Sequence, residues 1–92
     1  MTNTVANPLD VISGILHRIL EEYGEDGVEI TRDSTFHEGL GLESIDLVAL
    51  ATQLVEFYGE RVNLAEFLAE RELSELVELT VGQVADYVAS RL

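Results

Sequence analysis

The chain has 92 residues, with 18 acidic side chains against five arginines, no lysine, no cysteine and a formal net charge of −13. Such a surface disfavours nucleic acid and anionic membranes and favours basic protein partners, although acidity that serves only solubility explains the charge equally well. The length predicts one domain over residues 1–92. The lack of cysteine excludes disulfides and cysteine metal sites. Because the sequence has neither a membrane-length apolar run nor a signal peptide, we expect a cytoplasmic protein.

The first predicted helix begins after residues 1–6, which are polar and expected to fray. Asn7 is a favoured N-cap, and Pro8 is a favoured first helical residue. Gly24 is expected to follow the C-cap. Between them, apolar residues at helical spacing predict a buried stripe made of Leu9, Ile12, Ile15, Leu16, Ile19, Leu20 and Tyr23.

A long connection follows over residues 25–43 and shows no clear periodicity. Loops of this length in small domains are usually functional or mobile. Val28 and Ile30 are expected to attach the loop to the core, and Phe36 and Leu40 to attach it again just before Ser44.

The second predicted helix runs from Ser44 to Tyr58, a stretch without glycine or proline. Ser44 then stands at the helix N-terminus, where unpaired backbone N–H groups and the helix dipole favour a phosphate ester. The alternative is that Ser44 is only an N-cap. We expect the buried face to hold Leu50, Ala51, Leu54 and Tyr58. The outer face is expected to hold Ile45, Val48, Ala49 and Thr52, and exposed apolar residues of this kind indicate a binding surface.

The rest of the chain predicts two more helices. Asn63 is expected to cap a short third helix from Leu64 to about Arg71, whereas residues 72–79 either extend that helix or form an irregular connector. Thr80 and Gln83 form a capping-box pattern at the start of the last helix. The stripe of that helix is Val81, Val84, Ala85, Val88 and Leu92.

The segment Gly41-Leu42-Glu43-Ser44-Ile45-Asp46-Leu47-Val48 resembles the phosphopantetheine attachment motif of acyl and peptidyl carrier proteins. The core of that motif is Gly, any residue, Asp, Ser and Leu, followed closely by an acidic residue, and here Glu43 and Ile45 are conservative replacements. Residues 79–88 resemble the last helix of thiolation domains, so the likeness extends over most of the chain. The resemblance implies an all-α four-helix bundle with a long loop between helices 1 and 2 and a short third helix.

The resemblance also implies that a phosphopantetheinyl transferase moves 4′-phosphopantetheine from coenzyme A to Ser44, with magnesium present. The terminal thiol of that arm would hold acyl or aminoacyl groups as thioesters for loading and condensing enzymes. The implied partner-binding residues of this monomeric carrier are Leu42, Glu43, Ile45, Asp46, Val48, Glu56 and Val62. Ala49 and Val55 stand where fatty-acid carriers are often acidic, which favours polyketide or nonribosomal-peptide biosynthesis over fatty-acid synthesis.

No catalytic residue and no metal site is predicted. Leu42 and Asp46 stand where a nucleophile elbow needs glycine, and His37 is the one base near Ser44 in the sequence, so a serine hydrolase is a weak alternative. The acidic residues around Ser44 lack the spacing of a calcium loop, and His17 and His37 lack the spacing of metal ligands. The stronger alternative is a non-enzymatic helical interaction module that uses the same apolar helix without a cofactor.

Overall fold

A computed structural model of the chain describes residues 7–25 and 27–92, so the fraying expected for residues 1–6 lies outside the described part. Regular structure within these ranges is helical, and one isolated β-bridge accompanies it. The helices are α1 (Pro8–Glu22), α2 (Ser44–Tyr58), α3 (Leu64–Ala69), α4 (Leu73–Val77) and α5 (Val81–Ser90). None of them is long and apolar enough to cross a membrane.

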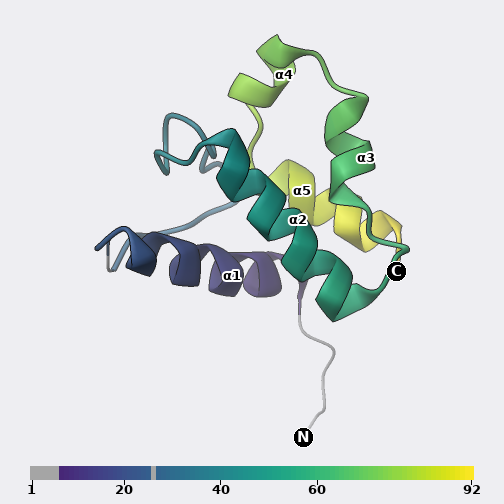
Figure 1. Cartoon of the computed structure of the whole chain (residues 1–92), viewed down its shortest axis with the longest axis horizontal. Coiled ribbons are helices and arrows are strands. Elements are labelled where there is room, and N and C mark those ends of the chain that lie inside the picture. The colour runs from purple at the N-terminus through teal and green to yellow at the C-terminus, as the bar shows by residue number, and fades with distance from the viewer. Residues whose placement is uncertain (1–6, 26) are drawn as a thin grey trace, which may run out of the picture.

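The helices form a bundle around one apolar core (Figure 1). Helix α1 packs against both α2 and α5, and α3 packs against α2. The predicted all-α bundle, long first loop and short third helix are therefore confirmed. One helix more than predicted is present, because α4 occupies the middle of the ambiguous segment 72–79 as a separate short helix.

Helix α1 has the predicted ends. The side chain of Asn7 accepts a hydrogen bond from the backbone N–H of Leu9 at 2.8 Å. At the other end, the N–H groups of Gly24 and Glu25 donate to carbonyls of the last turn, each at 3.0 Å, as in a Schellman motif. The buried stripe consists of Ile12, Ile15, Leu16, Ile19 and Leu20. Tyr23 was wrongly placed in this stripe, since its side chain is 60% exposed.

The later helix starts also follow local capping. Asn63 accepts from the N–H of Glu66 at 3.0 Å, and α3 ends at Ala69, two residues earlier than predicted. Thr80 and Gln83 form the predicted capping box, with reciprocal bonds of 3.2 and 2.9 Å. The buried residues of α5 include Val81, Val84, Ala85 and Val88. Leu92 was wrongly added to this stripe, because α5 ends at Ser90 and Leu92 is 53% exposed.

The long loop is fixed to the start of α5. Thr35 and Thr80 form an antiparallel bridge, and backbone bonds flank it from Phe36 N–H to Leu79 at 3.2 Å and from Val81 N–H to Ser34 at 2.9 Å. The N–H of Gly82 donates to the carbonyl of Arg32 at 2.9 Å. A Cβ atom at Gly82 would lie 2.9 Å from that carbonyl oxygen, so the close approach requires glycine.

The loop side chains carry out the expected attachment to the core. Phe36 and Leu40 are buried, and Val28 and Ile30 are partly buried against the core cluster. The loop therefore reaches Ser44 with its position determined by packing as well as by backbone hydrogen bonds.

Candidate functional site

Ser44 is the first residue of α2, and its side chain is exposed to solvent. The N-cap is Glu43, whose backbone is extended with φ −108° and ψ 174°. The alternative prediction that Ser44 is the N-cap is therefore wrong by one position. Because Ser44 is not the cap, its hydroxyl lies at the positive end of the helix without a capping role.

Asp46 determines where α2 begins. One carboxylate oxygen of Asp46 accepts from the backbone N–H of Glu43 at 2.9 Å, and the other accepts from the hydroxyl of Tyr23 at 2.7 Å. A carboxylate in the first helical turn is also stabilised by the helix dipole. These two bonds turn Asp46 inward, so that only 6% of its side chain is exposed.

The Tyr23–Asp46 bond connects the end of α1 to the start of α2. The hydrogen bond to Asp46 raises the pKa of Tyr23 above its ordinary value, and desolvation and the negative charge of Asp46 act in the same direction. The two helix ends that flank the long loop are therefore held together beside Ser44.

The residues just before Ser44 form a tight turn. The N–H of Leu40 donates to Thr35 at 2.9 Å, and the N–H of Leu42 donates to Phe36 at 2.8 Å. Gly41 has a φ of 68°, which favours glycine, and it lets the chain reverse between the buried side chains of Leu40 and Leu42. This turn delivers Ser44 to the surface directly after a buried residue.

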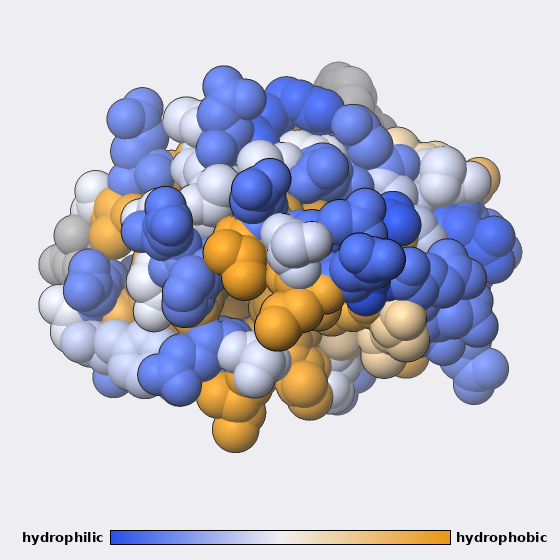
Figure 2. All heavy atoms as spheres, turned by 90° about the horizontal axis from the view of Figure 1, so that it is seen from above, coloured by the Kyte–Doolittle hydropathy of each residue, from blue (hydrophilic) through white to orange (hydrophobic). Residues whose placement is uncertain are grey.

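An apolar groove of about 590 Å³ lies beside Ser44. It is lined by Phe36, His37, Gly41, Leu42, Glu43, Ser44, Leu47, Leu73, Leu76 and Val77, which come from the loop, α2 and α4. Helix α4 buries none of its residues, and Leu73 is 76% exposed. Figure 2 views the molecule from the side on which α4 lies in Figure 1, and hydrophobic side chains gather in the middle of that face within a hydrophilic surround.

The predicted partner-binding residues fall into two groups. Four of them have exposed side chains, namely Glu43, Ile45, Val48 and Glu56. Three are buried and were wrongly placed on the surface, namely Leu42, Asp46 and Val62. The turn before α2 places Leu42 in the core. Asp46 is held inside by its hydrogen bonds with Glu43 and Tyr23, and Val62 is buried in the short connection to α3. Which exposed residues contact a partner stays a prediction.

The inner and outer faces of α2 lie as predicted for most residues. Leu50, Ala51 and Leu54 are buried, and Tyr58 is partly buried against the core. On the outer side, Ile45, Val48 and Thr52 are exposed, whereas Ala49 is only half-exposed. Phe57, which the sequence reading did not assign to either face, is 61% exposed.

Sequence reasoning missed two contributors to the site. The inward bond from Tyr23 had no local signal, because its partner lies 23 residues away. Helix α4 did have a local signal, because Glu72 and Glu75 stand three residues apart, at the spacing of a capping box. In the structure Glu75 accepts a hydrogen bond from the N–H of Glu72 at 2.9 Å. Neither finding brings ligands together for a metal: within residues 7–25 and 27–92, no group of three or more His, Cys, Asp or Glu side chains is placed to hold a metal ion.

Comparisons with known proteins agree with these features. The family model described as the phosphopantetheine attachment site matches residues 11–80, a range that contains Ser44 and the groove beside it. The chain is 29% identical over 76 residues to an acyl carrier protein of Saccharopolyspora erythraea, a match that covers 83% of this chain and 80% of that protein. No solved structure matches the chain significantly.

Proposed function

The chain belongs to the phosphopantetheine attachment family of acyl carriers, whose cofactor is covalently bound 4′-phosphopantetheine, and we propose that Ser44 is the residue that holds it here. The observation that carries this proposal is the exposed side chain of Ser44 at the first position of α2. A phosphate ester fits this place, because Ser44 is exposed to solvent and the helix N-terminus stabilises negative charge by about 0.3–1 kcal/mol.

The other residues of the site support attachment without taking part in it. Asp46 fixes the first turn of α2 through Glu43 and Tyr23, so Ser44 is presented in one backbone geometry. Glu43 is exposed beside Ser44 and offers a carboxylate to a basic side chain of the transferase. When attached, the cofactor supplies a terminal thiol that carries acyl groups. The chain has no cysteine and cannot supply such a thiol itself.

Phosphopantetheinyl transferases and biosynthetic enzymes are the general partners of acyl carriers. We propose that they contact the exposed residues around the start and outer face of α2, namely Glu43, Ile45, Val48 and Glu56. Apolar side chains supply the contact area, and the carboxylates select basic surfaces. The charge of −13 opposes self-association and supports a monomer, and we propose that residues 1–92 act as one carrier domain.

For the pathway, we propose polyketide or nonribosomal-peptide biosynthesis. The support is the apolar character of α2, whose residues Ala49 and Val55 are neutral and whose residues Ile45 and Val48 are exposed. A carrier of fatty-acid synthesis is the alternative. That alternative is favoured if purified fatty-acid-synthesis enzymes load the phosphopantetheinylated chain as fast as they load their own carrier.

Intact-mass measurement tests the attachment site. The purified chain is incubated with coenzyme A, magnesium and a broad-specificity phosphopantetheinyl transferase, and we expect the mass to rise by one phosphopantetheine group. Ser44→Ala should show no rise, whereas Ser74→Ala, which removes an exposed serine near the start of α4, should behave as the unsubstituted chain. A rise in Ser44→Ala would place the cofactor elsewhere, and no rise in any chain would favour the helical interaction module.

A further inference from the structure

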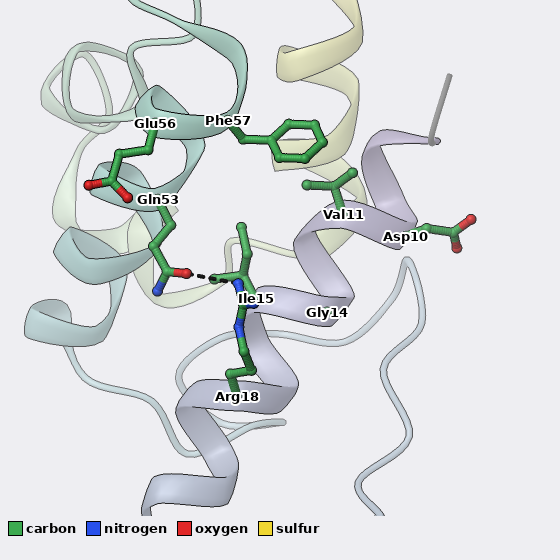
Figure 3. A pocket seen from close by; sticks show the side chains of 8 residues that line it. All are labelled: Asp10, Val11, Gly14, Ile15, Arg18, Gln53, Glu56 and Phe57. Atoms are coloured by element: carbon green, nitrogen blue, oxygen red, sulfur yellow. Dashed lines mark hydrogen bonds between the residues drawn. The ribbon is translucent and has the colours of Figure 1, made fainter. Parts of the chain in front are cut away.

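A second groove lies far from Ser44, between α1 and the C-terminal half of α2. Its volume is about 510 Å³, and Figure 3 shows the side chains that line it. Phe57 belongs to this groove and stands 13 residues after Ser44 on the same helix. At a rise of 1.5 Å per residue, the two places are about 20 Å apart along α2.

The groove has an apolar floor with room for an additional side chain. Phe57 is 61% exposed, and its ring packs edge-on against Tyr58 with a centroid distance of 4.8 Å. Val11 lies across the groove on α1, as Figure 3 shows. Gly14, one turn further along α1, contributes no side chain, and a Cβ atom placed there would meet nothing within 4 Å. An apolar side chain entering here would cover the Phe57 ring and remove it from water.

The charges around the groove favour a basic occupant. Asp10 and Glu56 are both exposed, and Figure 3 shows them at opposite edges with their carboxylates directed away from the apolar floor. Arg18 is the one cation among the lining residues, and its guanidinium donates to the side chain of Gln53 at 3.0 Å, which bridges α1 and α2. With two carboxylates against one guanidinium, in a chain of charge −13, a cationic partner is attracted and a second copy is repelled.

We propose that this groove is a second docking site, which takes an amphipathic helix from a basic partner protein. An apolar side chain of that helix lies over the open position at Gly14 against Phe57 and Val11, and flanking lysine or arginine side chains pair with Asp10 and Glu56. This is the helix-in-groove mode of recognition, in which an apolar row gives affinity and charges at the edges give selectivity. The site goes beyond cofactor attachment. It shares Glu56 with the contact surface proposed above, but its distance from Ser44 leaves the start of α2 free while the groove is filled.

A synthetic peptide serves as the probe. It has 15 residues of leucine, lysine and arginine, with leucines recurring at helical spacing, and an acidic twin carries glutamate at every basic position. Backbone amide shifts of the full chain are recorded by NMR while each peptide is added. We expect the basic peptide to shift resonances of residues 10–18 and 53–57, and to bind more weakly as salt is raised. The acidic twin should leave these resonances unchanged.

Three variants test whether the basic peptide binds in this groove. Phe57→Ser removes the exposed ring, and Gly14→Leu fills the space beside it, so each should weaken the basic peptide about tenfold. Leu92→Ser is the matched control, because Leu92 is also an exposed apolar residue, at 53%, but it lines neither this groove nor the groove beside Ser44. That variant should change the affinity by no more than about twofold. Circular dichroism checks that all three remain helical.

Several results would overturn the proposal. They are equal binding of the acidic twin, shifts confined to the surface around Ile45 and Val48, and unchanged affinity in both groove variants. A dimer of the chain alone that Phe57→Ser abolishes would assign the groove to a second copy instead. The attachment proposal is tested separately, because Phe57→Ser should still gain one phosphopantetheine group in the mass assay.

Discussion

The loop before α2 and the segment that contains α4 show that helical backbone and firm attachment are different properties. The described part of the loop, residues 23–25 and 27–43, has almost no regular structure, yet it buries Phe36, Leu40 and Leu42 and bonds through its backbone to the start of α5. Helix α4 completes its own hydrogen-bonded turn and buries no residue. Stability in a small protein comes mainly from tertiary burial, so the irregular segment is the more strongly held of the two.

Ser44 lies where these two segments meet. The loop forms one wall of the adjacent groove through Phe36 and Leu42, and α4 forms another through Leu73 and Val77. The serine is thus placed by the strongly held segment, whereas the groove is completed by the weakly held one. Local opening at α4 can change the groove without moving the helix start that presents Ser44.

Truncating one apolar side chain in each segment gives the largest expected contrast. Phe36→Ala should lower the free energy of unfolding by about 3–5 kcal/mol, since it empties a core position that is only 1% exposed. Leu73→Ala should change it by no more than about 0.5 kcal/mol, because this side chain is 76% exposed. Urea unfolding followed by circular dichroism measures both, and equal losses would contradict the difference in attachment.

A pair of glycine substitutions probes the backbone contact between the loop and α5. Gly82→Ala should cost about 1–3 kcal/mol, because the new Cβ would press on the Arg32 carbonyl at 2.9 Å. Gly14→Ala is the control within a helix, and it should stabilise the protein by about 0.5–1 kcal/mol, since open space surrounds that position and alanine is the better helix former. Thermal unfolding should therefore show opposite shifts. A higher unfolding temperature for Gly82→Ala would show that this contact yields easily.

The smallest expected effect concerns the bond that joins the two ends of the loop. The hydrogen bond to Asp46 raises the pKa of Tyr23 above 10.0, so the stabilisation from this bond is fully present below pH 10 and is lost as pH rises through the raised pKa. Ultraviolet titration of tyrosinate measures the pKa of Tyr23, when the titration curve of Tyr23→Phe is subtracted from that of the unsubstituted chain. That difference also removes the signal of Tyr58, whose pKa is raised by burial.

Asp46→Asn supplies the control for this titration. It keeps a side chain of similar size but removes the negative charge, so the pKa of Tyr23 should fall back toward its ordinary value. An unchanged tyrosine titration in Asp46→Asn would show that the bond does not fasten the loop ends in solution.

Helix starts at Asn7, Asn63 and Thr80 could be predicted because capping is local. In each case the side chain of the cap reaches a backbone N–H only two or three residues away, so the signal is contained in a few consecutive letters. The all-α class and most of the buried stripes followed from helical periodicity for the same reason.

The sequence predicts both ends of α2, Ser44 and Tyr58, as the structure has them, but the burial around its start could not be read in this way. Asp46 turns inward because it meets Tyr23, and Leu42 is buried because its turn folds back onto the residues near Phe36. Such contacts depend on tertiary structure, which leaves no periodic trace in the sequence. The short α4 has too few residues for periodicity, and the apolar residues nearly all round α2 gave no reason to place Phe57 outside.

The bridge between Thr35 and Thr80 has a consequence for the order in which the protein is completed. It joins segments separated by roughly half of the chain, and contacts of such long range form slowly. While the chain is still being translated, the loop lacks these backbone partners until the residues at the start of α5 have left the ribosome. The serine-bearing end of α2 thus gains its full support only after the first turn of α5 has been synthesised, so a nascent chain that stops before α5 cannot present it to a modifying enzyme in its mature form.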